Sequence, residues 1–204
     1  MEENSTYLTL ETLSEGVYKE KGSKFIGLAQ ACYSEEEAKD LLAQWKNEHH
    51  QARHLCYAYR FGVHKDVWRA NDDGEPSNSA GPPILGQIDA FDLSNVLIGV
   101  VRYFGGTKLG VGGLIAAYRA AAKEALLNGV IVQREVYEYI ELRFNYEEMP
   151  MVMHVLKRYG LEMMSNDFTL DCSLTTKLHL KEAALIKKEL NKFASLNLCV
   201  TGIH

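Results

Sequence analysis

The segment 102–113, RYFGGTKLGVGG, constrains the fold of this chain more than any other. Five of its residues are glycine, and they fall within nine positions that begin at Gly105. The apolar run 96–101 precedes the segment and is typical of a strand buried on both faces. The alanine-rich stretch 114–127 follows it and predicts a helix. We therefore expect a glycine-rich loop that connects a buried strand to a helix.

A loop of this kind suits an anionic ligand. Glycine permits positive φ and lets the backbone approach a ligand closely, and a helix N-terminus offers free N–H groups and a positive dipole end. Two cationic side chains in the segment suit phosphate. The candidate ligand- or anion-binding residues are Arg102, Gly105, Gly106, Thr107, Lys108, Gly110, Gly112 and Gly113. The alternative is a tight strand-to-helix connection that binds no ligand.

The glycine spacing excludes two known nucleotide-binding motifs. In the P-loop pattern GxxxxGK[ST], read from Gly105, Val111 stands where lysine is required. In the dinucleotide pattern GxGxxG, read from Gly110, the last position is Ile115. Any anion site here is therefore of another kind.

A second candidate lies in the acidic loop Asp72-Asp73-Gly74-Glu75. Its carboxylates Asp72, Asp73 and Glu75 could hold Mg²⁺ together with a phosphate oxygen, although their spacing is not that of an EF-hand. Asp-Gly is also common in a solvated turn. A third alternative is that the carboxylates pair with Arg102 or Lys108 and position the two loops without catalysis.

His54 and Cys56 lie two residues apart on a predicted strand, 54–61, so their side chains share a face. This suggests a Cys/His nucleophile pair, but a core histidine beside a buried thiol is the simpler interpretation. On the same strand, Leu55, Tyr57, Tyr59 and Phe61 are expected on one face and Cys56 and Ala58 on the other. The aromatic residues Trp68, Tyr103 and Phe104 flank the two loops and either stack bases or anchor the loops.

The two halves of the chain have different patterns. In the first, a strand at 24–32 precedes a helix that Ser34 caps with Glu37, and residues 69–83 predict a long loop that leads into a short helix. The second half predicts strands and helices in the order β-α-β-β-α-β, and its alternating run 168–178 is either two strands or one long one. We place the domain boundary so that the domains are 1–134 and 135–204.

Composition and charge exclude several classes of protein. The formal net charge is −5, so a nucleic-acid partner would need a local basic patch. The four cysteines, Cys32, Cys56, Cys172 and Cys199, form no CxxC pair, and each is expected to be buried and reduced. The polar, acidic start at residues 1–4 is not that of a signal peptide, and no apolar stretch reaches the length of a membrane span. We expect a cytoplasmic protein.

Four segments resemble the Impact family, in particular its bacterial YigZ-type members. They are KGSKFI from Lys21, HLCYAY from His54, DDGEPS from Asp72, and RYFGGTKLG from Arg102, the last followed by Gly112-Gly113-Leu114 and Ala117-Tyr118. Two positions depart from the family pattern: Asn78 replaces a glycine, and Ala116 stands where arginine is usual. Asparagine can still adopt the left-handed conformation, whereas Ala116 removes one phosphate contact.

The resemblance implies an α+β protein. Its first domain is expected to have the ribosomal protein S5 domain 2-like fold, and its second to be ferredoxin-like, similar to the last domain of elongation factor G. The resemblance also implies translation control, because the eukaryotic relatives act there through protein partners. It adds Lys24, His54, Asp72, Asp73, Glu75 and Tyr118 as secondary site candidates.

Two functions are consistent with these observations. The first is a non-enzymatic protein of translation control that recognises RNA, the ribosome or a protein partner through the glycine-rich and acidic loops, with no cofactor. The second is a metal-assisted hydrolase or transferase, in which Asp72, Asp73 and Glu75 hold Mg²⁺ while Arg102 and Lys108 hold the phosphate of a small substrate. We prefer the first, because no general base or nucleophile can be named from the sequence.

Overall fold

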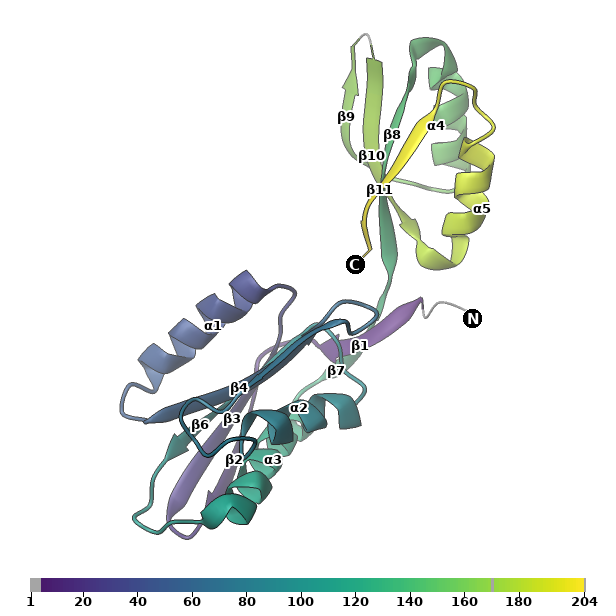
Figure 1. The fold of residues 1–204 in the computed structure, drawn as a ribbon. Helices are drawn as coiled ribbons and strands as arrows, with labels where there is room; N and C mark the ends of the chain where they lie inside the picture. The colour runs from purple at the N-terminus through teal and green to yellow at the C-terminus, as the bar shows by residue number, and fades with distance from the viewer. Residues whose placement is uncertain (1–4, 170, 204) are drawn as a thin grey trace. The chain divides into compact units, whose positions relative to one another are not determined.

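The computed structural model describes residues 5–169 and 171–203 (Figure 1). These residues form two compact units, Tyr7–Arg134 and a second unit made of 135–203 with residues 5 and 6. Position 170, in the run expected to alternate, lies outside the described residues, as do residues 1–4 and 204. The chain is a mixed α/β protein, and no helix in the described part is both long and apolar enough to cross a membrane.

The first unit is a five-stranded antiparallel sheet between layers of helix. Its strands lie in the order β2-β3-β6-β4-β5, and a separate pair is formed by β1 and β7. Helix α1 covers one face of the sheet, and helices α2 and α3 cover the other (Figure 1). The elements are β1 (Thr6–Leu10), β2 (Ser14–Glu20), β3 (Ser23–Ala31), α1 (Glu35–Glu48), β4 (His54–Phe61), β5 (Val67–Asn71), α2 (Gly81–Ala90), β6 (Val96–Tyr103), α3 (Gly110–Asn128) and β7 (Ile131–Glu135).

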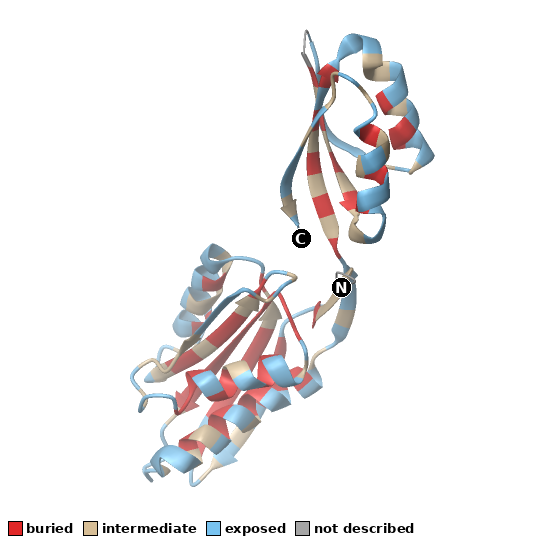
Figure 2. Cartoon of the chain, turned by 45° about the vertical axis from the view of Figure 1, so that its right-hand side comes forward, coloured by how far each residue is buried: buried red, intermediate tan, exposed pale blue. Residues whose placement is uncertain are grey.

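The first unit has a hydrophobic core on each face of its sheet, and strand β4 shows how the sequence pattern contributes to both. Leu55, Tyr59 and Phe61 pack in the core under α1, whereas Cys56 and Ala58 pack in the core under α2 and α3. The predicted alternation of this strand is confirmed. Figure 2 shows the consequence: buried residues run along the inner strands of the sheet, and β6 is buried from Val96 to Arg102.

The predicted N-terminal cap of α1 is confirmed. The Ser34 hydroxyl accepts a hydrogen bond from the Glu37 backbone N–H at 3.1 Å. The Glu37 carboxylate in turn accepts from the backbone N–H of Tyr33, one residue before the cap, at 2.8 Å. Two free donors at the start of the helix are thereby satisfied.

Several boundaries differ from the prediction. The loop expected at 69–83 begins later, because 69–71 belong to β5, an edge strand whose exposed side chains give no apolar period. Helix α3 begins at Gly110 rather than at 114, because the low helix propensity of glycine hides its first turn in the sequence. Strands β1, β2 and β7 were not predicted, since each is short or largely exposed on one face.

The second unit has the predicted order β-α-β-β-α-β, which is confirmed. Its four strands form an antiparallel sheet in the order β11-β8-β10-β9. Alternate residues of the first strand, counted from the residue before it, are buried as expected: Val136, Glu138, Ile140, Leu142 and Phe144. The elements are β8 (Tyr137–Asn145), the 3₁₀ helix η1 (Tyr146–Glu148), α4 (Met149–Arg158), β9 (Met163–Phe168), β10 (Asp171–His179), α5 (Leu180–Leu190) and β11 (Asn197–Ile203).

Three of the four cysteines are buried, but Cys199 is exposed, which corrects the expectation for that residue. Burial raises the pKa of the Cys32 thiol to about 12 and also raises the pKa of Cys56. Because the thiolate is the reactive form, we expect a thiol-specific disulfide reagent to label Cys199 rapidly and the other three only after unfolding. Cys199→Ser should remove the rapid phase, and a rapid phase that survives in this variant would contradict the burial of the other thiols.

Candidate functional site

The register of the central strands places three side chains in one row. Arg102 of β6 lies opposite Phe25 of β3 on one side and opposite His54 of β4 on the other. Directly opposed residues of antiparallel strands share a face of the sheet. Because Phe25 packs in the core under α2 and α3, the row faces those helices.

Arg102 is buried, with only 9% of its side chain exposed, and forms an ion pair with Glu75, whose side chain is 4% exposed. The Arg102 Nη1 donates to Glu75 Oε1 at 2.5 Å, and the Tyr118 hydroxyl donates to the same oxygen at 2.8 Å. A buried charge pair is stable only when further hydrogen bonds and contacts support it. Of the alternatives for the acidic loop, an ion pair with the glycine-rich loop is therefore observed.

Aromatic rings enclose the Arg102 guanidinium. Its central carbon lies 5.5 Å from the centre of the Phe25 ring and 5.6 Å from the centre of the Phe104 ring. Tyr118 packs edge-on against Phe25, with the ring centres 5.2 Å apart. These contacts and the Glu75 pair fix both the position and the plane of the guanidinium.

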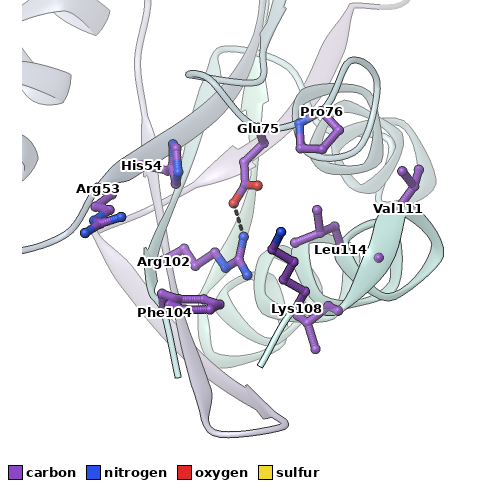
Figure 3. A pocket seen from close by; sticks show the side chains of 11 residues that line it. Arg53, His54, Glu75, Pro76, Arg102, Phe104, Lys108, Val111 and Leu114 are labelled. Atoms are coloured by element: carbon purple, nitrogen blue, oxygen red, sulfur yellow. Dashed lines mark hydrogen bonds and ion pairs between the residues drawn. The ribbon is translucent and has the colours of Figure 1, made fainter. Parts of the chain in front are cut away.

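The Arg102–Glu75 pair lies in a pocket of about 500 Å³, which we call the Arg102 pocket (Figure 3). Its residues come from the start of β4, the acidic loop, the end of β6 and the start of α3. The lining residues are Arg53, His54, Glu75, Pro76, Arg102, Phe104, Lys108, Leu109, Gly110, Val111 and Leu114. The acidic and glycine-rich loops thus meet in one site.

The Arg102 pocket is electropositive. It presents three cationic side chains, Arg53, Arg102 and Lys108, against the carboxylate of Glu75. Arg102 is neutralised by that carboxylate, whereas Arg53 and Lys108 are exposed and have no ion pair within the described residues. Figure 3 shows the Lys108 ammonium group turned toward the Arg102–Glu75 pair.

The N-terminus of α3 forms part of the pocket wall through Gly110 and Val111. No side chain caps this 19-residue helix, whose N-cap residue is Leu109. The first backbone N–H groups of a helix lack partners within the helix, and they carry the positive end of its dipole. The wall therefore adds hydrogen-bond donors to a site that already has an excess of positive charge.

His54 contributes a ring with a defined tautomer. Its Nδ1 lies 2.7 Å from the backbone carbonyl oxygen of Asp73. A carbonyl oxygen can only accept, so Nδ1 carries the proton, and Nε2 is an acceptor in the neutral ring. The pairing with Cys56 has no support as a nucleophile, because that thiol is buried, its pKa is raised by burial, and it donates to the Asp72 carbonyl oxygen at 3.0 Å.

Of the glycine-rich candidates, Arg102, Lys108 and Gly110 line the pocket, whereas Gly105, Gly106, Thr107, Gly112 and Gly113 do not. Gly105 has a packing role: a Cβ there would lie 1.9 Å from the backbone carbon of Gly22 in the β2–β3 turn. Its backbone N–H donates to the Ser23 hydroxyl at 3.1 Å. Only glycine permits this close approach of two turns.

Among the secondary candidates, Glu75 and His54 line the pocket and Tyr118 lies behind it, bonded to Glu75. Lys24 is exposed on the other face of the sheet, because Ile26 and Leu28, at alternate positions of the same strand, pack in the core under α1. This secondary candidate therefore does not line the Arg102 pocket.

The remaining carboxylates of the acidic loop accept backbone hydrogen bonds. Asp72 accepts from the N–H groups of Asn78, Ala80 and Gly81 at 2.8, 2.9 and 2.8 Å. Asp73 accepts from the Leu55 N–H at 2.8 Å. Within 5–169 and 171–203, no three His, Cys, Asp or Glu side chains are grouped so that they could hold a metal ion.

Asn78 has a φ of 62°, so the left-handed conformation expected at this family glycine position is confirmed. It lies in the turn that Asp72 holds together. The departure from the family pattern therefore leaves the geometry of the loop intact.

Sequence reasoning missed several pocket residues. Arg53 has no motif of its own, and its only signal was its place beside His54 at the start of a strand. Phe104 was predicted only as a residue that flanks the loops; it is 52% exposed and lies over Arg102. Pro76, Leu109, Val111 and Leu114 are apolar and gave no signal of a site.

Comparison with known proteins places these features in a family. The Impact N-terminal domain model matches residues 21–126. A Thermus thermophilus protein described as an IMPACT family member is 41% identical over 142 residues, which cover 69% of this chain and 75% of that relative. The Escherichia coli family member YigZ is 28% identical over 186 residues, which cover 90% of this chain and 91% of YigZ.

Two solved structures are also similar. A crystal structure described as that of a hypothetical protein matches with a TM-score of 0.77 and 27% identity, and the match covers 97% of this chain and 98% of that chain. A structure of the two-domain translational regulator Yih1 matches with a TM-score of 0.38 and 25% identity, over 58% of this chain and 48% of that chain.

Proposed function

This chain belongs to the Impact N-terminal domain family, and from that premise we propose that it is a binding protein of translation control, acting in the cytoplasm, that holds an anionic group of its partner in the Arg102 pocket. The partner is RNA, the ribosome or a protein. Translation control comes from the family resemblance, whereas the anionic group comes from the chemistry of the pocket.

The observation that carries the proposal is the imbalance of charge in the pocket. Arg53 and Lys108 have no carboxylate partner among the described residues, although both line the same pocket as the buried Arg102–Glu75 pair. The start of α3 adds backbone donors next to Lys108. A phosphate or carboxylate on a partner would satisfy these groups together, which favours recognition of an anion over a plain strand-to-helix connection.

The fold of each unit is part of the proposal. We assign the unit Tyr7–Arg134 to the ribosomal protein S5 domain 2-like fold and the second unit to the ferredoxin-like fold of the last domain of elongation factor G. The strand order β11-β8-β10-β9 and the order β-α-β-β-α-β support the second assignment. Superposing each unit separately on those domains tests both, and strands paired in a different order would contradict them.

Binding to ribosomes and to RNA should depend on salt through Lys108. We expect the chain to co-sediment with ribosomes or to bind RNA, and the affinity to fall as salt rises, because phosphate contacts release counterions. Lys108→Ala should lower the slope of log affinity against log salt by about one. The matched control is Lys39→Ala, which removes an exposed lysine of α1, on the other face of the sheet.

The control variant should bind as the unsubstituted chain does. If Lys108→Ala and Lys39→Ala had the same salt slope, the partner would not contact the pocket. Absent or salt-insensitive binding would exclude RNA and ribosome together and would leave a protein partner to be sought.

A further inference from the structure

Part of the wall of the Arg102 pocket is apolar. Five of its lining residues are apolar: Pro76, Phe104, Leu109, Val111 and Leu114. Phe104 is 52% exposed although its ring lies over the Arg102 guanidinium. A bare anion would gain nothing from this wall, whereas a ligand with an apolar or planar part next to its charge would contact it.

We propose that the Arg102 pocket takes a nucleotide, whose phosphate lies against Lys108 and the first N–H groups of α3 and whose base stacks on Phe104. The inference rests on the proposed function and deepens it, because it names the chemical class of the anionic group. The nucleotide is either a free mononucleotide or the 5′-terminal nucleotide of a single-stranded RNA, since both carry a phosphate monoester beside a base.

The start of α3 is open to a phosphate. A Cβ at Gly110, which lines the pocket, would meet nothing within 4 Å, so there is free space beside the first residue of the helix. Lys108 lies immediately before the first turn of α3 and is not paired within the described residues. A phosphate here would receive backbone N–H bonds, the helix dipole and one ammonium group.

Arg102 contributes a fixed, paired guanidinium to the pocket rather than a free donor. Its side chain lines the pocket and is more than nine-tenths buried, yet its Nε has no hydrogen-bond partner among the described residues. A buried donor without a partner is uncommon in folded proteins. Because this Nε is closed to solvent, the charge left for a ligand is that of Arg53 and Lys108, which form no ion pair among the described residues.

Phe104 offers a platform for a base. Its ring and the guanidinium beneath it form a layered pair, and bases stack on both aromatic rings and arginine planes. Glu75 and Phe25 hold that guanidinium in place, so the platform is formed before a ligand arrives. A volume of about 500 Å³ lies within the range for small-ligand pockets, roughly 300–1,000 Å³.

Calorimetric titration of the full chain with adenosine 5′-monophosphate, adenosine and inorganic phosphate tests the inference. We expect the monophosphate to bind more tightly than either of the other two. Lys108→Ala should weaken it about tenfold through loss of one charge-assisted contact. Phe104→Leu keeps an apolar cover over Arg102 but loses the stacking surface, and it should weaken the monophosphate about fivefold or more while leaving phosphate binding unchanged.

Two RNA tetranucleotides, one with a 5′-phosphate and the other with a 5′-hydroxyl, distinguish an RNA end from a free nucleotide as the ligand. Tighter binding of the phosphorylated RNA would assign the pocket to an RNA end, and binding of the monophosphate with neither RNA would assign it to a free nucleotide. Equal binding of both RNAs would overturn the inference. So would no binding of any phosphorylated ligand, equal affinity for phosphate and monophosphate, or an unchanged affinity in Phe104→Leu.

The nucleotide inference and the proposed function can fail independently of each other. Salt-dependent co-sedimentation with ribosomes that is retained in Phe104→Leu, with no nucleotide bound, would leave the proposed function and remove the nucleotide. Nucleotide binding without any ribosome, RNA or protein association would leave the nucleotide site and remove the proposed function. Lys39→Ala should bind the monophosphate as the unsubstituted chain does, since α1 lies on the other face of the sheet.

Discussion

Replacing Glu75 by alanine should lower the free energy of unfolding by about 3–5 kcal/mol, because it leaves the buried charge of Arg102 without its partner. Both side chains are more than nine-tenths buried, so water does not replace the lost carboxylate at low energy. The Tyr118 hydroxyl loses its acceptor in the same variant. Chemical denaturation followed by circular dichroism measures the change.

The matched controls separate charge from shape. Glu75→Gln keeps an oxygen for Arg102 and Tyr118 but no charge, so its loss should be smaller than that of Glu75→Ala. Adding Arg102→Met to Glu75→Ala removes the unpaired charge, and the double variant should be more stable than the sum of the single effects predicts. A Glu75→Ala variant within about 1 kcal/mol of the unsubstituted chain would contradict the buried pair.

Although Glu75→Ala should destabilise the fold, it should strengthen the binding of anions in the pocket. Without Glu75, the pocket keeps the cations Arg53, Arg102 and Lys108 and loses its carboxylate. We therefore expect phosphate to stabilise Glu75→Ala more than it stabilises the unsubstituted chain, since a ligand that binds only the folded state raises its stability. An equal effect of phosphate on both chains would mean that the anion binds elsewhere.

The sequence predicted the elements better than the site, for a physical reason. Strand β4 and the order of the elements in the second half follow from alternation and helical spacing, which are local properties of the chain. The Arg102 pocket depends on register. Arg102 meets Glu75 across 27 positions, and Phe25 and His54 flank it only because β3 and β4 pair with β6 on either side.

The same distinction explains why Lys24 and Gly105 do not line the Arg102 pocket. Lys24 and Arg102 were both site candidates. Lys24 lies one position from Phe25, the residue opposite Arg102, and an offset of one residue on a strand places a side chain on the other face of the sheet. Gly105 read as a ligand-binding glycine, whereas its missing Cβ accommodates Gly22. The role of each residue is decided by a partner that is distant in the sequence, and a rule based on local spacing does not identify that partner.

Replacing Asp72 by alanine should lower the free energy of unfolding by about 2–4 kcal/mol. Its carboxylate accepts three backbone N–H bonds, two of them from Ala80 and Gly81 at the start of α2. Ala80 and Gly81 are buried, so their donors would lose a charged acceptor with little access to water. Asp66→Ala, which removes an exposed carboxylate between β4 and β5, should change stability by less than about 0.5 kcal/mol.

A titration with Mg²⁺ decides between this structural role and a metal site. If Asp72 serves to hold the turn, Mg²⁺ should not change the denaturation midpoint of the unsubstituted chain, because both carboxylate oxygens already accept hydrogen bonds within the loop. If instead Mg²⁺ raised that midpoint and failed to raise it in Asp72→Ala, the ion would bind the folded acidic loop, as the alternative of a metal-assisted enzyme requires. The Asp72 carboxylate would then exchange backbone donors for the ion, and α2 would lose the acceptor that now holds its first turn.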